Sequence, residues 1–268
     1  LKGYQIPETG RSAKGMNIVN LLELENGEKI TAMFPIQEFA DDKFLFFVTR
    51  QGIAKRIVLS DLQNIRRAGL RALNLNEDDA LVDVRLTDGE QNILIATHEG
   101  KAICFDENEV RAMGRVATGV RGIKLREGDY VVGAGVCRPG ATVLTISEEG
   151  KGRRSRIDDY RITKRGGLGI RNYSNGNVAG IKIVDDTDDL ILISQNGILI
   201  RIHASDINIQ SRYGSGVRVM RLVEDDKVAV VARVDRDNEA ETAKIEDTGE
   251  TDPTPEELEA IAAAEAAE

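Results

Sequence analysis

"ILIATHEGKAICF", residues 93–105, is one copy of a pattern that occurs four times in this chain. An apolar run ends in Thr97, two variable residues follow, and Gly100 precedes a second run. The other copies are "FLFFVTRQGIAKRIVL" (44–59), "TVLTISEEGKGRRS" (142–155) and "LILISQNGILIRI" (190–202). Each copy predicts a β-hairpin whose turn glycine takes a positive φ, because glycine adopts that conformation without a Cβ penalty.

The repeat has a period near fifty residues. Its turn glycines, at spacings of 48, 50 and 47 residues, are Gly52, Gly100, Gly150 and Gly197. A second element places an arginine four residues before a glycine: Arg11 and Gly15, Arg115 and Gly119, Arg165 and Gly169, Arg212 and Gly216. One unit departs in spacing, with Arg66, Arg67 and Gly69. A third element is a leucine with an acid four residues later: Leu24 and Glu28, Leu75 and Asp79, Leu125 and Asp129, Leu222 and Asp226.

These features predict an all-β fold. Short strands, glycine turns and a period of this length fit a circular array of small antiparallel sheets better than a helical solenoid. The only modest helical candidate is "LSDLQNIRRA" (59–68). We count four full blade repeats and the second half of one before Ile36. Because the chain begins at Leu1 with a partial repeat, we expect it to be a piece of a longer protein.

Charge divides the chain into two regions. Residues 235–268 contain 13 acidic and 2 basic residues, a net charge of −11, which leaves +2 for residues 1–234 out of the total of −9. The acidic region has almost no large apolar residues, so we expect a β domain over 1–234 and a disordered acidic tail over 235–268. Two roles stay open for the tail: competition with an anionic ligand for the basic residues of the β domain, or solubility.

The composition of the chain, 41% apolar and 30% charged, is that of a soluble globular protein. No run reaches the roughly 18 apolar residues of a membrane span, and the start lacks the features of a signal peptide. We therefore expect a cytoplasmic protein with no membrane partner.

The histidines, cysteines and acidic residues do not show the sequence spacing of a known catalytic or metal site. His98 and His203 have no partner at the spacing of a triad or zinc site, and we expect surface or half-buried imidazoles. Cys104 and Cys137 are expected to be small buried thiols. The paired acids fall in predicted loops, where turn formation explains them: Asp41 and Asp42, Asp78 and Asp79, Asp158 and Asp159, Asp225 and Asp226. We expect no cofactor, no metal and no catalytic residue in this chain.

Basic residues recur at equivalent places in the repeats. If the repeats are blades of a ring, these residues form a band on one rim, which would neutralise phosphates whatever the base sequence. The chain has no Trp and only 4% aromatic residues, so duplex backbone is a better ligand than stacked single strands. The candidate DNA-binding residues are Arg11, Lys14, Lys55, Arg56, Arg66, Arg67, Lys101, Arg115, Arg121, Lys151, Arg153, Arg154, Lys164, Arg165, Arg201 and Arg212.

Several stretches carry a family resemblance: "YQIPE" (4–8), "GRSAKGMNIVNLLELENGEKITA" (10–32), "VRAMGRVATGVRGIKLREGD" (110–129) and "SRYGSGVRVMRL" (211–222). Over residues 1 to 234 the chain resembles the C-terminal domain of the DNA gyrase A subunit, from bacterial type IIA DNA topoisomerases. The resemblance implies a six-bladed β-pinwheel, with strands exchanged between blades and a first blade that is incomplete here. It also implies a basic rim that wraps duplex DNA and supports ATP-dependent negative supercoiling.

The resemblance also implies partners. They are double-stranded DNA, the remainder of the gyrase A subunit, and the gyrase B subunit in a heterotetramer associated with the nucleoid. The DNA-cleaving tyrosine, the ATPase and its Mg lie in other parts of that assembly, so we expect no catalysis by this chain alone.

Residues 163–169, "TKRGGLG", raise the question of a phosphate loop, but the glycine pattern of nucleotide-binding loops is incomplete. The stretch is similar to the Gln-Arg-Arg-Gly-Gly-Lys-Gly box of the gyrase family at Arg165, Gly166, Gly167 and Gly169. It departs from the box at Thr163, Lys164 and Leu168. We interpret it as a degenerate relative of the box in a later blade, with the true box upstream of Leu1.

Two other functions remain open. The first is the C-terminal domain of the topoisomerase IV A subunit, which has the same blades, lacks the box and wraps DNA poorly. The second is a protein-interaction propeller with no role on DNA.

Overall fold

The computed structural model describes residues 3–8, 10, 13–17, 20–22, 24, 28, 30–65 and 69–234. The chain divides into two units, Leu1–Val234 and Asp235–Glu268. The first unit contains every strand described below. The predicted disorder of the acidic tail concerns residues outside the described part of the chain, as do the candidate residues Arg11, Arg66 and Arg67.

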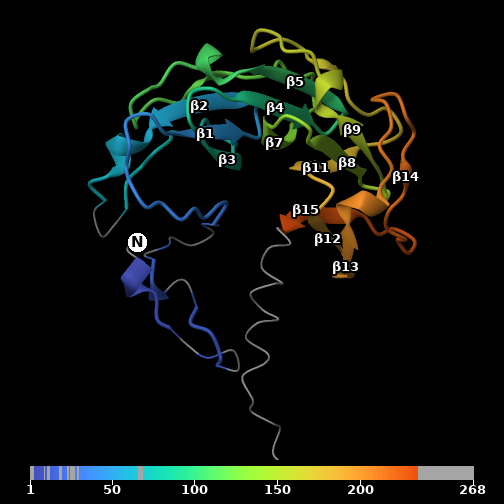
Figure 1. Ribbon diagram of the computed structural model, residues 1–268, viewed down its shortest axis with the longest axis horizontal. Coiled ribbons are helices and arrows are strands. Elements are labelled where there is room, and N and C mark those ends of the chain that lie inside the picture. Colours follow the sequence, from blue (N-terminus) through green and yellow to red (C-terminus); the bar gives the residue numbers. More distant parts are fainter. Residues whose placement is uncertain are drawn as a thin grey trace, which may run out of the picture. The chain divides into compact units, whose positions relative to one another are not determined.

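Four antiparallel hairpins form the centres of four small sheets, which we call blades A to D in chain order (Figure 1). They coincide with the four copies of the apolar–glycine–apolar pattern. Their strands are β1 (Phe44–Thr49) with β2 (Ile53–Val58), β4 (Asn92–Thr97) with β5 (Lys101–Asp106), β8 (Thr142–Ser147) with β9 (Lys151–Arg156), and β12 (Asp189–Ser194) with β13 (Leu199–His203).

Each hairpin receives an inner strand from its own repeat, paired antiparallel to the first hairpin strand. Successive inner strands contact one another, so the blades follow each other in chain order within this unit (Figure 1). The inner strands of blades A to D are β3 (Leu81–Thr87), β7 (Val131–Cys137), β11 (Val178–Val184) and β15 (Val228–Val234).

The fourth strand of a blade comes from the next repeat. In blades A to C a two-residue strand from the following repeat pairs antiparallel with the second hairpin strand. These exchanged strands are β6 (Val120–Arg121), β10 (Ile170–Arg171) and β14 (Val217–Arg218). The expected strand exchange is therefore confirmed at three blade junctions. The fold is all-β and propeller-like, with four blades among the described residues.

The helical segments in the described part of the chain are short 3-10 turns that follow hairpins or lie near the start. They are η1 (Gly3–Gln5), η3 (Leu59–Leu62), η4 (Glu107–Glu109), η5 (Ile157–Asp159) and η6 (Ala204–Asp206). The modest helix indicated by residues 59–68 is a single 3-10 turn at Leu59–Leu62; residues 63–65 add no further helical turn, and residues 66–68 lie outside the described part of the chain.

The apolar core lies between successive blades. Phe46 of β1 packs with Ile95 and Phe105 of blade B, and Leu144 of β8 packs with Leu192 of blade D. The first hairpin strands of blades B and C, β4 and β8, have a neighbouring blade on each side and are buried on both faces, which explains why they are almost continuously apolar instead of alternating. Each such side chain contributes about 1.5 to 3 kcal/mol through its removal from water, so a blade is stabilised mainly by its neighbours.

The turn glycines also carry the exchange. Gly100 has a φ of +78°, as the sequence predicts, and its carbonyl oxygen accepts hydrogen bonds from the N–H groups of both Asn172 and Tyr173. A Cβ on Gly100 would lie 2.1 Å from the carbonyl oxygen of Tyr173. Gly169 precedes β10 with a φ of +68°, and its Cβ would lie 2.4 Å from the oxygen of Ala102. Both glycines are therefore required by close backbone approach as well as by turn geometry.

The recurrent acid of the third sequence element also has a structural role. One carboxylate oxygen of Asp79 accepts the N–H of Gln51 at 2.9 Å, and Asp129 accepts that of Glu99 at the same distance. Asp226 accepts the N–H of Asn196 at 3.1 Å. These aspartates connect each hairpin turn to the loop before the inner strand of the same blade. They were expected only to form local turns, so this tertiary contact is an additional role.

We expect Gly100→Ala to destabilise the protein more than Gly197→Ala does. Gly197 is the equivalent glycine of blade D, with a φ of +84°, and nothing lies within 4 Å of its Cβ position. Gly197→Ala should therefore cost only the left-handed strain of about 1 to 2 kcal/mol. Gly100→Ala adds the clash with Tyr173, which we expect to cost about 1 to 3 kcal/mol more. Thermal and urea unfolding of both variants measure the difference, and equal losses would refute this role of the exchanged segment.

Candidate nucleic-acid interface

The exchanged strands place one exposed arginine at the outer edge of each of blades A to C. In each strand the first residue is half-buried and the second is exposed, as alternation along a strand requires. The exposed residues are Arg121, Arg171 and Arg218. In the described part of the chain, none of these three guanidinium groups has a hydrogen bond or ion pair. Three unpaired cations therefore recur at one position of the repeat.

We call the segments 107–124, 157–171 and 204–221, which contain these strands, the outer rim. They contain 11 basic and 5 acidic residues, a net charge of +6 in a chain whose total is −9. The described residues of each segment also share a role in the fold, since each begins with a 3-10 turn and ends at or just after an exchanged strand. Positive charge is thus concentrated where one repeat crosses to the preceding blade.

Neighbouring segments of the outer rim are hydrogen-bonded to each other. The N–H of Gly166 donates to the oxygen of Gly122 at 2.6 Å, and the N–H of Lys124 donates to the oxygen of Gly167 at 2.8 Å. Arg165 donates from Nη1 to the carbonyl of Arg121 at 3.0 Å. These bonds join the first two segments into a continuous surface.

The same bond recurs one blade further on, where Arg212 donates from Nη1 to the carbonyl oxygen of Arg171 at 2.6 Å. Arg165 and Arg212 are the arginines of the Arg-xxx-Gly element. Both are half-buried. Part of each guanidinium is therefore used to connect adjacent rim segments, a role that the sequence pattern did not reveal.

Two of the predicted DNA-binding residues are cations buried beneath the outer rim. The Lys55 ammonium is fully buried and donates to the carbonyls of Ala72, Arg115 and Ala117 at 2.6, 2.7 and 2.8 Å. Its three donors are all used. Burial lowers the pKa of Lys55 from its usual value. Two of the acceptors belong to the outer rim, so Lys55 fixes the path of that loop from below.

Arg153 has the equivalent position in blade C and is also fully buried. Its Nε donates to the carbonyl of Gly214 at 3.2 Å, and its Nη2 donates to that of Arg212 at 2.8 Å. A further bond from Nη2 reaches the carbonyl of Asn172. The carbonyls of this rim loop therefore point inward to a buried cation, as they do above Lys55.

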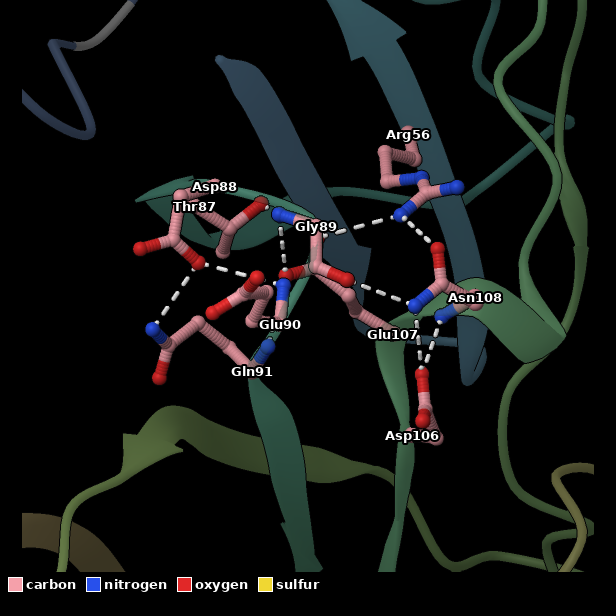
Figure 2. A network of polar contacts seen from close by, with 9 residues as sticks. All are labelled: Arg56, Thr87, Asp88, Gly89, Glu90, Gln91, Asp106, Glu107 and Asn108. Atoms are coloured by element: carbon pink, nitrogen blue, oxygen red, sulfur yellow. Dashed lines mark hydrogen bonds and ion pairs between the residues drawn. The ribbon is translucent and has the colours of Figure 1, made fainter. Parts of the chain in front are cut away.

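Arg56 and Arg154 form buried contacts between structural elements. Arg56 donates from Nη1 to Asn108 at 2.9 Å and lies 3.3 Å from the carboxylate of Glu107 (Figure 2). Glu107 is fully buried and also accepts from the Thr87 hydroxyl at 2.6 Å and from the N–H of Gly89 at 2.8 Å. Its charge is thus compensated by a cation and by several donors, and the network links blade A to blade B.

Arg154 has the corresponding role in blade C. Its Nε donates to the carbonyl of Ile207 at 2.7 Å, and its Nη1 pairs with Asp186. A buried guanidinium with these partners does not reach a phosphate. Lys55, Arg56, Arg153 and Arg154 were predicted to contact DNA, whereas the structure aims them inward, and we leave them out of the interface proposed below.

The remaining predicted residues fall into two groups. Lys14, Arg115, Arg121, Lys151, Lys164 and Arg201 are exposed, and Lys101, Arg165 and Arg212 are half-buried. Arg201 lies 2.6 Å from the buried carboxylate of Asp189, and Lys151 lies 3.7 Å from Glu149. The outer rim also contains six basic residues that the prediction did not include: Arg111, Lys124, Arg161, Arg171, Arg218 and Arg221. A usable signal was present for two of them: Arg171 and Arg218 stand two residues after Gly169 and Gly216, as Arg121 stands after Gly119.

Residues 163–169 lead into β10, a strand. Nucleotide-binding phosphate loops open a helix, so this loop has a different context. Its Thr163 N–H donates to the Cys104 carbonyl at 2.8 Å, and Gly166 and Gly169 both have positive φ. The loop is a turn that carries Lys164 and Arg165 to the outer rim.

Each histidine contacts a carboxylate in this fold. The His98 ring stacks on Tyr130, and its Nε2 lies 3.0 Å from the Glu148 carboxylate. Although burial opposes the shift, hydrogen bonds with Lys227 and His98 hold the pKa of Glu148 below its usual value. His203 Nδ1 lies 2.5 Å from Asp189.

The cysteines Cys104 and Cys137 are free thiols with Sγ atoms 3.5 Å apart. Cys104 is buried and Cys137 is half-buried. Their proximity was not predicted from the sequence.

Within the described residues, no group of three or more His, Cys, Asp or Glu is arranged to hold a metal ion, and no helix is long and apolar enough to cross a membrane.

Comparison with known proteins assigns the family. The model of the DNA gyrase C-terminal domain, a β-propeller, matches residues 1–37, 43–88, 91–138, 141–185 and 188–235. The DNA gyrase A subunit of Staphylococcus aureus strain NCTC 8325 is 43% identical over 258 residues. The alignment covers 94% of this chain and 29% of that relative. The chain thus spans less than a third of the length of this relative.

Two solved structures are similar. The C-terminal domain of DNA topoisomerase IV superposes with a TM-score of 0.80 at 29% identity, covering 87% of this chain and 75% of that one. A DNA gyrase A C-terminal domain superposes with a TM-score of 0.72 at 26% identity, covering 82% and 75%. From the matched repeats and the relative's identity, the chain belongs to the DNA gyrase C-terminal domain family.

Proposed function

We propose that the outer rim binds duplex DNA by its sugar-phosphate backbone and wraps it, as the DNA-wrapping part of a gyrase A subunit. One observation carries this proposal. In the strand register, Arg171 of β10 lies opposite Lys101, and Arg218 of β14 lies opposite Lys151. Like charges directly opposite each other destabilise a sheet. A polyanion on this edge turns the same arrangement into a favourable one.

The chemistry of the rim favours duplex over single strands. Arginines and lysines neutralise phosphates without reading the bases. Stacking of unpaired bases requires aromatic platforms, and the chain has no Trp, 6 Phe and 5 Tyr. The proposed contacts are made by the exposed and half-buried basic residues of the outer rim, together with Lys101 and Lys151. Lys14 and Arg201, and Arg11, Arg66 and Arg67 outside the described residues, remain candidates.

The family relationship supports a setting for this activity. We propose that the chain acts within a heterotetramer of gyrase A and B subunits in the bacterial cytoplasm, associated with the nucleoid. There, wrapping would present a DNA crossing for ATP-dependent negative supercoiling. DNA cleavage and ATP hydrolysis, with its Mg, would be performed by other parts of that assembly, so this chain alone would be non-catalytic.

A complete ring of six blades is part of the proposal. Five segments of the chain match the family repeat. In the described part of the chain, blade D has three strands, and no strand pairs with the outer side of β13. In blades A to C the equivalent edge is covered by an exchanged strand. An exchanged strand from a further repeat would complete blade D.

The structural similarity to topoisomerase IV favours a second candidate function, the C-terminal domain of the A subunit of that enzyme. The two candidates differ in wrapping. Ligation of nicked plasmid with the bound chain distinguishes them. A change of linking number in proportion to bound protein supports the gyrase function, whereas binding without such a change supports topoisomerase IV.

We expect the triple substitution of Arg121, Arg171 and Arg218 by Gln to weaken duplex binding for all sequences alike. Each phosphate contact contributes about 0.9 to the slope of log affinity against log salt. The variant should therefore lower the magnitude of that slope by about 2 to 3. Fluorescence anisotropy with two duplexes of unrelated sequence, across a salt series, measures both effects.

A matched control replaces Arg50, Arg126 and Lys227 by Gln. These exposed residues lie in the hairpin turn of blade A and in the loops before β7 and β15. The control removes the same number of positive charges, but from residues that lie outside the exchanged strands. Its slope of log affinity against log salt should therefore stay close to that of the parent chain. Equal losses from the two triples would show that total charge, and no particular surface, determines binding.

Lys55→Met should destabilise the blade A rim and weaken DNA binding. The change leaves three buried carbonyls without a donor, which we expect to cost about 3 kcal/mol of unfolding free energy. Methionine has a similar length, so the loss arises from the ammonium group. Lys227→Met removes an exposed charge as a control. Thermal unfolding and the salt series measure both variants, and a Lys55→Met variant as stable as the parent chain would argue against this role.

A further inference from the structure

The outer rim over blades B and C contains an open pocket, formed where segments 157–171 and 204–221 meet, that none of the preceding roles explains. Its volume is about 360 Å³, and its lining residues are Asp159, Arg161, Ile170, Arg171, Arg212 and Tyr213. They come from three parts of the outer rim: the turn after β9, strand β10, and the loop before β14. Three arginines and one aspartate give the pocket a net charge of +2.

The arginines of this pocket retain free donors. Among the described residues, the side chains of Arg161 and Arg171 have no hydrogen-bond or ion-pair partner, and both are exposed. Arg212 donates from Nη1 to the Arg171 carbonyl at 2.6 Å, while its Nε is buried without any partner in the described chain. The exposed guanidiniums of Arg161 and Arg171 use none of their donors within the described chain, so they are available to an acceptor from outside it.

The aromatic ring of Tyr213 forms one side of the pocket. Its side chain is 66% exposed, and the Arg212 guanidinium lies 5.2 Å from the ring centroid and 5.7 Å from that of Tyr160. These contacts fix the position of the guanidinium, and the Tyr213 hydroxyl is a further donor of the kind that binds phosphate oxygens. Three guanidiniums and a phenol suit an oxyanion such as a phosphate better than a neutral ligand.

The same arrangement occurs one repeat earlier. Arg111, Arg121 and Arg165 occupy the positions of Arg161, Arg171 and Arg212. Arg165 donates to the carbonyl of Arg121, as Arg212 does to that of Arg171, and its Nε also donates to the Glu109 carbonyl at 2.7 Å. The earlier copy has Gly166 in place of Tyr213, and its Arg165 Nε is already bonded to Glu109, so the later copy, at the B–C junction, has fewer of its donors used within the chain.

We infer that Arg161, Arg171 and Arg212 form a seat for one backbone phosphate of duplex DNA at the B–C junction, and that Arg111, Arg121 and Arg165 form a second seat at the A–B junction. This inference rests on the proposed function. Each seat combines arginines from two repeats across a blade junction. The path of the duplex is therefore fixed at successive junctions, and the exchange of strands is what assembles each site.

The test compares Arg161→Gln/Arg171→Gln with Arg126→Gln/Lys227→Gln, which removes equal charge in loops leading to inner strands. Loss of the seat should weaken duplex binding about tenfold or more and lower the magnitude of the salt slope by about 1. The control pair should change neither quantity. Both replaced arginines are exposed, and equal melting temperatures of the two variants confirm that folding is retained.

Two further measurements distinguish the alternatives. In arginine Nε NMR spectra, the Arg212 Nε proton should shift on addition of duplex in the parent chain and should shift less in Arg161→Gln/Arg171→Gln. Arg161→Lys/Arg171→Lys should keep the salt slope and lose part of the affinity, because lysine lacks the bidentate fork. Inorganic phosphate alone should shift the same proton only weakly and should compete with duplex.

The outcomes separate the two levels of the proposal. If the parent chain does not bind duplex, the proposed function fails. If the parent chain binds duplex but Arg161→Gln/Arg171→Gln retains the parent affinity and salt slope, the proposed phosphate site is wrong, while the proposed function is still supported. If inorganic phosphate saturates the Arg212 signal without affecting duplex binding, the pocket is a site for free anions and the inference is overturned.

Discussion

Hydrogen bonds between a turn glycine and the backbone just after the strand that the next repeat contributes to the same blade hold this structure together. The carbonyl of Gly100 accepts two N–H groups from the following repeat, and the carbonyls of Gly52 and Gly150 do the same. A two-residue strand contributes little stability by itself. It stays in place because the following backbone is fixed over the hairpin turn, where only glycine leaves enough room. The outer edge of each blade thus depends on the next repeat.

This constraint determines where charge can be presented. The exchanged strand has one inward position, filled by Val or Ile, and one outward position, filled by arginine in all three copies. The loop before it is fixed from below by Lys55 in blade A and Arg153 in blade C. Buried cations hold the loop carbonyls, and exposed cations face solvent. The buried and the exposed basic residues occur in similar sequence contexts, but they have different roles.

The sequence predicted the fold well, because its signals are local. The positive φ of the turn glycines and the hairpins follow from patterns within about fifteen residues, and the return of these patterns at spacings of 47 to 50 residues predicts the blades. Strand exchange came from the family resemblance and was confirmed. The site was harder to predict. Lys55 and Arg121 are both basic residues beside a repeat glycine, yet one is fully buried and the other exposed. Whether Lys55 is buried depends on its contacts with the carbonyls of Arg115 and Ala117, some sixty residues away in sequence. No local sequence pattern encodes such contacts.

Site-specific photo-crosslinking to duplex DNA tests the central claim most directly. A photoreactive residue at Val116 or Leu168 lies on the outer rim, where these side chains are 77% and 50% exposed. At Leu86 of β3 or Val230 of β15, it lies on an inner strand with 41% or 45% exposure. Our account predicts crosslinks from Val116 and Leu168 and none from the inner positions. Crosslinks from Leu86 and Val230 in place of the rim positions would contradict it.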